Sequence, residues 1–385
     1  MFHHKRVLVS CGTKFHSDHV SWQLYKNGLL EKTVTAHPPG KYLNRVNLPR
    51  KRGTFLPPIF VIPYVLYKIP YIGNTLARLI EYRLPAIFDF MASFFTSEAN
   101  ISLSWSWASW YTIKRIKARN GIAILEESGS CNLYQNELLA DEYSRLNLRF
   151  RNKTPAYIIR RELREADLAD FILCPSQHVA NTFIEQGIPK EKFVIIPYGV
   201  NLERFSPSPN SAHKFRIIFV GTIGVRKGLI YLFKALEALG HLPDLECILV
   251  GGIEVGFEPI FKQYQHLVTY LGRVSQEKLA TIYQSGAVFV FPSLDEGMAL
   301  VQLEAMACGL PVITTINAGA DAVIQNGIQG FFIPVRDTEA LREKIHFLYQ
   351  NPLIRRKMAE NALKRAQEFT WDRYGDQLSA FINTL

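Results

Sequence analysis

Two carboxylates lie within the run from Phe291 to Pro311: Glu296 in a loop just before a predicted helix, and Glu304 in the body of that helix. A strand is expected to end at Pro292, and a helix to begin at about Met298. The free amides and the dipole of a helix N-terminus stabilise a phosphate. Glu296 in the loop could then accept hydrogen bonds from sugar hydroxyls, and Glu304 from a ribose diol, because each carboxylate oxygen accepts one hydroxyl. The alternative is a capped helix with solvated acids.

A second loop carries positive charge at the start of another predicted helix. It runs from Val220 to Gly228 and contains Gly221, Thr222, Arg226 and Lys227. Arginine grips a phosphate with paired donors, whereas lysine acts as a point charge. Alone, this pattern is weak, since a basic surface turn would explain it equally well.

Two further turns follow predicted strands and complete the pattern. One holds Gly251, where the absence of a side chain allows close approach to a ligand. The other ends at Val274 and is suited to holding a flat base against backbone groups.

The elements that must position these loops alternate regularly after residue 215. Strands are predicted at 216–220, 245–250, 267–271, 287–291, 311–314 and 330–333, and helices at 228–239, 275–285, 299–308, 318–326 and 337–350. Apolar strands alternating with helices indicate a parallel sheet covered on both faces. We expect a domain boundary in the loop-like residues 202–214.

The first half of the chain is harder to interpret. Strands are predicted at 6–10, 122–125, 170–175 and 192–197, and helices at 156–167 and after Ser176. Residues 74–120 look largely helical. Their aromatic cluster, Trp105, Trp107, Trp110 and Tyr111, is interpreted as core rather than as a stacking platform.

Glu296 and Glu304 have seven residues between them and are followed by Ala-Met-Ala-Cys-Gly-Leu-Pro, a pattern that resembles the E-x7-E signature of the retaining family 4 glycosyltransferases. The resemblance includes Arg-Lys-Gly at 226–228, Ala-Asp-Phe-Ile-Leu-Cys-Pro-Ser at 169–176 and Val-Ile-Ile-Pro-Tyr-Gly-Val-Asn at 194–201. It covers about 165–375 and implies a GT-B fold, in which two Rossmann-like α/β domains with parallel sheets face a central cleft.

The resemblance implies a domain division and a role for each motif residue. Residues 1–205 would bind the acceptor, residues 214–371 would bind the nucleotide-sugar donor, and a last helix at 372–385 would pack back on the first domain. Transfer would retain the anomeric configuration, with Glu296, Arg226 and Lys227 as catalytic residues. The donor would contact these three and Gly221, Thr222, Gly251, Val274, Gly297, Met298, Ala299 and Glu304.

The N-terminal half departs from the family pattern. Its acceptor loop is reduced to Cys11-Gly12-Thr13, and the histidine that many members carry in the first domain has no clear counterpart. The candidate acceptor or cleft residues are Gly12, Thr13, His16, Glu127 and Asn132. The missing histidine leaves open a non-catalytic nucleotide-sugar-binding partner protein, and the fold leaves open a nucleotide-sugar epimerase.

The family's donors are usually UDP- or GDP-sugars. A lipid-linked or polysaccharide acceptor would suit the apolar segment 54–72, and a small molecule is the alternative. No Asp-x-Asp motif for a metal occurs in the sequence, and Arg226 and Lys227 can compensate the leaving-group charge. We therefore expect no metal or other cofactor and full activity in excess chelator. Nucleic-acid binding is not expected, because the sequence has neither an interleaved aromatic stripe nor helix-turn-helix or zinc spacing.

Composition and charge suggest where the protein acts. The net charge is +10, from 44 basic and 34 acidic residues, which suits an anionic partner. The five cysteines are widely spaced and favour free thiols in a reducing cytoplasm, and the first residues lack the apolar stretch of a signal peptide. A basic run at 41–52 precedes an apolar segment at 54–72 whose four prolines argue against a spanning helix. We expect a helical hairpin there, and peripheral attachment to the inner face of the membrane.

Overall fold

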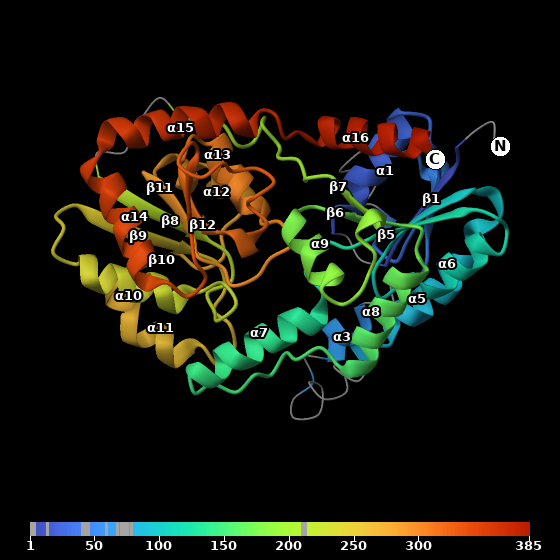
Figure 1. Ribbon diagram of the computed structural model, residues 1–385, viewed down its shortest axis with the longest axis horizontal. Coiled ribbons are helices and arrows are strands. Elements are labelled where there is room, and N and C mark those ends of the chain that lie inside the picture. The colour runs from blue at the N-terminus through green and yellow to red at the C-terminus, as the bar shows by residue number, and fades with distance from the viewer. Residues whose placement is uncertain are drawn as a thin grey trace.

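The computed structural model describes residues 5–12, 15–39, 47–57, 61–66, 69, 77, 80–208 and 214–385. They form two lobes side by side, each built on one sheet (Figure 1). The N-terminal sheet has seven strands in the order β3-β2-β1-β4-β5-β6-β7, and the C-terminal sheet has six in the order β10-β9-β8-β11-β12-β13. Their strand pairings are parallel. The predicted class, two α/β units with parallel sheets, is confirmed.

The N-terminal lobe contains the first half of the chain. Its strands are β1 (Val7–Cys11), β2 (Leu30–Thr35), β3 (Gly53–Phe55), β4 (Ile101–Trp105), β5 (Ile122–Glu126), β6 (Phe171–Cys174) and β7 (Phe193–Ile195). Its α-helices are α1 (Ser17–Lys26), α3 (Val61–Leu66), α5 (Leu84–Ala92), α6 (Trp110–Lys117), α7 (Asn132–Arg145), α8 (Ala156–Leu168) and α9 (Gln177–Ile184).

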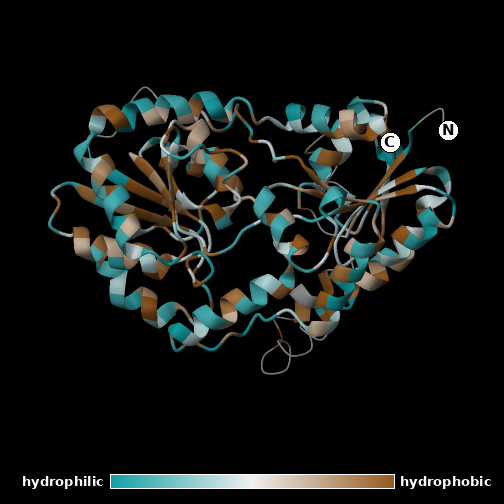
Figure 2. Ribbon diagram, viewed as in Figure 1, coloured by the Kyte–Doolittle hydropathy of each residue, from teal (hydrophilic) through white to brown (hydrophobic). Residues whose placement is uncertain are grey.

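The C-terminal lobe repeats the same plan. Its strands are β8 (Phe215–Val220), β9 (Leu245–Val250), β10 (Thr269–Tyr270), β11 (Val288–Phe291), β12 (Val312–Thr315) and β13 (Gly330–Ile333). Its helices are α10 (Leu229–Leu239), α11 (Glu258–Tyr264), α12 (Gln276–Gln284), α13 (Leu300–Ala307), α14 (Thr338–Gln350) and α15 (Pro352–Ala366). The apolar strands form the core of each lobe, and the helices around them present polar residues outward (Figure 2).

In both sheets the strand order changes direction at one point. In each sheet the first three strands are added in one direction, and the fourth then pairs with the first on its other side. The change of direction therefore falls between β1 and β4 in one sheet and between β8 and β11 in the other. Ligands of open parallel sheets bind at the carboxyl ends of the strands beside such a point. Each lobe therefore offers one place for a site.

Two helices connect the lobes. After α15, the last helix α16 (Trp371–Thr384) returns along the top of the molecule and packs on α1 (Figure 1). Asp372 there accepts hydrogen bonds from Gln23 and Lys26, at 2.8 and 2.7 Å. Helix α7 crosses between the lobes on the opposite side of the molecule.

The structure corrects three predictions of local structure. Residues 74–120 are helical over much of their described part, as predicted, but their buried Ile-Ser-Leu-Ser-Trp segment forms the strand β4 at the centre of the first sheet, which was not predicted. Residues 318–326 form turns rather than a helix. The strand predicted at 267–271 is only β10, after a 3₁₀ turn at Gln265–Leu267.

The apolar segment 54–72 differs from the expected hairpin where it is described. Thr54 and Phe55 belong to strand β3, and α3 is a single short helix; residues 58–60, 67–68 and 70–72 lie outside the described part, as do 41–46 of the basic run. Within the described ranges, no helix combines the length and apolarity needed to cross a membrane. The five cysteines are free and buried, as predicted.

Candidate active site

Three loops of the C-terminal lobe meet at the carboxyl edge of its sheet. Strand β8 pairs with both β9 and β11, so the loops that follow these strands are neighbours. The amide of Gly221 donates to Val250 at 2.9 Å, and that of Leu294 donates to Arg226 at 2.8 Å. The loops carrying Gly221, Thr222, Gly251, Arg226, Lys227 and Glu296 are thus brought together beside the β8/β11 switch point.

The charged residues of these loops form one cluster. Glu296 Oε1 lies 2.6 Å from Arg226 Nη1 and also contacts the ammonium of Lys227. Burial alone would raise the pKa of Glu296, but the charges of Arg226 and Lys227 outweigh it and hold that pKa below its usual value. Asp295 and Glu254 also lie near Arg226. A phosphate that displaced Glu296 would therefore meet the two cations of Arg226 and Lys227.

The start of α13 supplies free backbone donors beside this cluster. The residue before the helix, Ala299, provides no side-chain cap. The amides of Gly297 and Met298 find no hydrogen-bond acceptor in the described part of the chain, whereas that of Ala299 donates to Ala318 at 3.3 Å. Uncapped amides and the helix dipole favour an anion, so phosphate oxygens could bind here against Arg226 and Lys227.

Glu304 occupies a separate position in the body of α13. It accepts a hydrogen bond from the hydroxyl of Tyr283, at 3.0 Å, and burial raises its pKa. Val274 follows the edge strand β10 and is half-buried. Glu304 thus lies in the helix that follows the Glu296 loop, and Val274 follows the strand next to β9.

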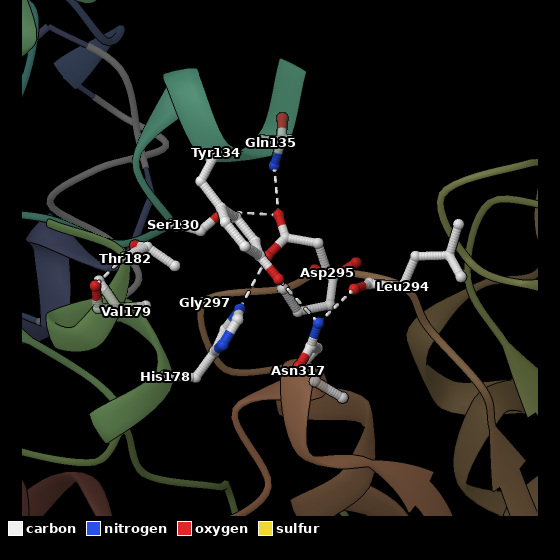
Figure 3. Close-up of polar contacts among 12 residues, drawn as sticks. Ser130, Tyr134, Gln135, His178, Val179, Thr182, Leu294, Asp295, Gly297 and Asn317 are labelled. Carbon is white, nitrogen blue, oxygen red and sulfur yellow. Dashed lines mark hydrogen bonds and ion pairs between the residues drawn. The ribbon is translucent and has the colours of Figure 1, made fainter. Parts of the chain in front are cut away.

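A buried carboxylate next to Glu296 ties the loop to the other lobe. Asp295 Oδ2 accepts hydrogen bonds from Ser130 and Gln135, both at 2.6 Å, and Oδ1 lies 2.9 Å from His178 Nε2 (Figure 3). Although burial opposes it, hydrogen bonding to His178 and Ser130 lowers the pKa of Asp295. We refer to Asp295 and its three partners as the inter-lobe clasp.

Sequence reasoning did not identify the inter-lobe clasp. Its partners are 165, 160 and 117 residues from Asp295 along the chain, so no local pattern pairs them. The available signal was indirect: Ser130 and His178 both follow strand ends, and Asp295 adjoins Glu296.

The backbone of the two lobes also touches beside the clasp. A Cβ atom on Gly297 would lie 1.9 Å from the carbonyl oxygen of Ser128, so only glycine fits there. The Gly297 carbonyl in turn accepts a hydrogen bond from Ser176, at 2.6 Å. The loop that ends at the start of α13 is therefore held from both lobes.

Helix α7 extends this contact along its length. Glu142 accepts hydrogen bonds from Tyr231 and Arg336 of the C-terminal lobe, both at 2.6 Å. Arg336 also pairs with Asp141 at 2.8 Å. Because these groups lie on opposite lobes, their interactions hold the two lobes together along α7.

The candidate residues of the N-terminal lobe fall into two groups. Gly12, Glu127 and Asn132 line a cavity of about 530 Å³. His16 lies beside it, with Nε2 2.9 Å from Glu126, which also lines the cavity. Thr13 lies outside the described residues. The backbone amide of Asn132 donates a hydrogen bond to the Glu162 carboxylate, at 2.9 Å.

Comparison with known proteins covers most of the chain from α7 onward. The family model described as "Glycosyltransferase Family 4" matches residues 135–204, and the model described as "Glycosyl transferases group 1" matches residues 202–365. A D-inositol 3-phosphate glycosyltransferase of Arthrobacter sp. is 32% identical over 197 residues, 46% of this chain and 47% of that protein. The capsular polysaccharide biosynthesis glycosyltransferase CapM of Staphylococcus aureus is 29% identical over 236 residues, 55% of this chain and 61% of that protein.

Solved structures match the chain over its whole length. Anabaena HepE in complex with UDP has a TM-score of 0.72 at 16% identity, covering 99% of this chain and 100% of that one. Sucrose-phosphate synthase of Thermosynechococcus elongatus has a TM-score of 0.71 at 19% identity, covering 99% and 98%. The chain spans 44–64% of the length of the curated relatives named by the sequence comparison. Two adjoining family models and the two-lobed fold agree, and the chain therefore belongs to the family 4, group 1 glycosyltransferases and has the GT-B fold.

Proposed function

We propose that the protein is a retaining, nucleotide-sugar-dependent glycosyltransferase. In this proposal residues 214–371 bind the donor, residues 1–205 bind the acceptor, and the donor diphosphate lies between Arg226, Lys227 and the start of α13. The observation that carries it is that Arg226 and Lys227, both partly exposed, contact the same carboxylate of Glu296. Beside them, the amides of Gly297 and Met298 find no acceptor within the described residues.

Each group has a distinct part in the proposed reaction. The bond between the anomeric carbon and the diphosphate breaks, the acceptor oxygen bonds to that carbon, and the acceptor gives up its proton. Negative charge develops on the departing diphosphate, and Arg226, Lys227 and the amides stabilise it at fixed positions. Glu296, released by the two cations when phosphate binds them, contacts the sugar; Glu304 contacts the ribose.

The relatives support a class of donor and acceptor. One HepE structure is a complex with UDP-glucose, and a Corynebacterium glutamicum relative is named as GDP-mannose-dependent and acts on a phosphatidylinositol monomannoside. We propose a UDP- or GDP-sugar as the donor, and a lipid-linked or polysaccharide acceptor. Because Arg226 and Lys227 supply the compensating charge, a metal is not required.

Release of nucleoside diphosphate from intact nucleotide sugars tests this function. The whole chain is incubated with UDP-glucose, UDP-N-acetylglucosamine, GDP-mannose and ADP-glucose in excess chelator, and the diphosphate is quantified. We expect slow release from one UDP- or GDP-sugar. Binding of that nucleotide without release would favour the non-catalytic partner protein instead.

An exposed aromatic surface supports peripheral membrane attachment. Phe90 of α5 and Phe94 just after it are 46% and 54% exposed, and their rings meet at 5.2 Å. The guanidinium of Arg115 lies over the Phe94 ring at 3.8 Å. Aromatic side chains with basic neighbours suit an anionic bilayer. We propose that this surface lies on the inner face of the cytoplasmic membrane.

The double variant Phe90→Asp/Phe94→Asp is expected to lose most of its binding to anionic vesicles. Burying one phenylalanine contributes about 1.5–3 kcal/mol, so the affinity should fall by at least roughly 10-fold. Sedimentation with phosphatidylglycerol vesicles at low salt measures it, and added salt should reverse wild-type binding. Phe347→Asp, at a 37% exposed site on α14, is the control. Equal sedimentation of all three proteins would disprove attachment through this surface.

A further inference from the structure

The cavity of the N-terminal lobe has the position of a binding site. The loops after β1, β4 and β5 line it, so it lies at the β1/β4 switch point of the first sheet. Ser128 and Ser130, which also line it, touch Gly297 and Asp295 of the other lobe. A molecule in this cavity would therefore lie next to the loop that carries Glu296.

Three buried polar atoms of this cavity lack a partner within the described residues. They are Glu126 Oε2, Glu127 Oε1 and Trp105 Nε1, on side chains that are 1–3% exposed. Buried polar groups are nearly always hydrogen-bonded. Two acceptors and one donor thus point to a ligand that both donates and accepts hydrogen bonds.

The charges of the cavity limit which ligand fits. Its charged residues within the described lining are all acids, Glu81, Glu126, Glu127 and Glu162. Burial, followed by the charge of Glu162, raises the pKa of Glu127 well above its usual value. A phosphate or carboxylate would add negative charge here, and both would be repelled. The Glu127 carboxyl can accept hydrogen bonds from sugar hydroxyls and, when protonated, can also donate one to a sugar oxygen.

The walls of the cavity add apolar faces to these polar atoms. Trp105, Trp107, Tyr82 and Phe15 all line it, which revises the interpretation of Trp105 and Trp107 as core alone. Trp107 Nε1 donates a hydrogen bond to Glu162, at 3.2 Å, whereas Trp105 Nε1 has no acceptor among the described residues. Aromatic faces beside convergent polar groups match the alternation of C–H faces and hydroxyls on a pyranose ring.

We propose that this cavity binds an uncharged sugar unit of the acceptor, recognised by Glu126, Glu127 and Trp105, and that it rejects phosphorylated and uronic acid units. The inference rests on the proposed function, because it assigns the acceptor for that reaction. It goes beyond that function by naming the chemistry and the charge of the group that is glycosylated.

Saturation-transfer NMR of the whole chain with matched sugars tests the proposal. The neutral probes are the methyl glycosides of glucose, galactose, mannose and N-acetylglucosamine, and the charged probes are the anions glucose 6-phosphate and glucuronate. We expect transfer to at least one neutral glycoside, with signals at least roughly 10-fold weaker for the charged probes. Transfer to none of the neutral glycosides, or stronger transfer to a charged probe, would overturn it.

Variants test whether the neutral sugar binds in this cavity and distinguish its binding from that of the nucleotide donor. Glu127→Ala and Trp105→Phe, which removes only the indole donor and part of the ring, should each weaken the neutral signal by roughly 10-fold. Glu127→Gln, which keeps a donor and an acceptor, should preserve it, and the exposed Glu343→Ala is the control. UDP and GDP titrations check folding. Unchanged signals in Glu127→Ala and Trp105→Phe would overturn the proposal of a sugar site in this cavity. If the wild-type protein bound neither UDP nor GDP, the proposed glycosyltransferase function would be disproved instead.

Discussion

Glu296→Gln should bind the nucleotide more tightly than wild type and yet lose transfer. Glu296 Oε1 forms ion pairs with both Arg226 and Lys227. It therefore competes with the donor diphosphate for these two cations. Removing this competing charge should tighten nucleotide binding by roughly 3- to 10-fold, since an ion pair in such a site contributes about 1 kcal/mol. Loss of a group that acts at the reaction centre should lower the rate of transfer by about 10²- to 10³-fold.

The same change should make stability depend more strongly on the nucleotide. Without Glu296, the partly buried cations of Arg226 and Lys227 lack their counter-charge, which destabilises the free protein. A bound diphosphate would restore that counter-charge. Calorimetry and thermal unfolding with and without the nucleotide measure both effects. Glu246→Gln is a matched control, because Glu246 also bridges a lysine and an arginine, Lys214 and Arg216, but at a more exposed position. Weaker nucleotide binding by Glu296→Gln would show that Glu296 does not compete with the diphosphate.

Asp295→Ala should lower the rate strongly while leaving nucleotide affinity nearly unchanged. The Asp295 carboxylate contacts Ser130, Gln135 and His178 of the opposite lobe, whereas its neighbour Glu296 faces the cations. Loss of the inter-lobe clasp should therefore misplace the acceptor relative to the donor. A displacement of about 1 Å can cost about 10²-fold in rate.

The contrast between rate and affinity separates this positioning role from a role in the donor site. Nucleotide affinity of Asp295→Ala should stay within about threefold of wild type, because Arg226, Lys227 and the α13 amides are intact. Gln135→Ala removes one donor of the inter-lobe clasp and should show a smaller loss of rate. A parallel fall of rate and nucleotide affinity in Asp295→Ala would place Asp295 in the donor site instead.

The C-terminal lobe was predictable because its signals are local. A strand such as β11 is a continuous run of apolar residues, which can be recognised from the sequence alone. The loops with Arg226 and Glu296 directly follow such strands. Parallel pairing then brings these loops to one edge of the sheet. The turns at 318–326 were missed because their buried apolar residues, such as Val323 and Ile324, mimic a helical pattern. Gly319 there has a φ of 65°, a left-handed conformation that does not continue a helix.

The N-terminal lobe was less predictable because its contacts are distant in sequence. Strand β4 alternates serine with apolar residues, and both Ser102 and Ser104 are buried. Because a central buried strand is expected to be apolar throughout, β4 was not recognised from its sequence. The inter-lobe clasp and the cavity depend on how lobes and loops meet in space. Glu127 could be noted as a post-strand residue, but its unpartnered oxygen is visible only in the folded chain.

The central claim is that the C-terminal lobe binds a nucleoside diphosphate through residues of this chain alone. Calorimetric titration of UDP, GDP and ADP into wild type and Glu304→Ala, in excess chelator, tests it most directly. We predict that UDP or GDP binds and that Glu304→Ala weakens it by roughly 10- to 100-fold, because hydrogen bonds to a charged group contribute about 1.5–3 kcal/mol. If none of the three nucleotides binds, or if Glu304→Ala binds as tightly as wild type, the account of the donor site is contradicted.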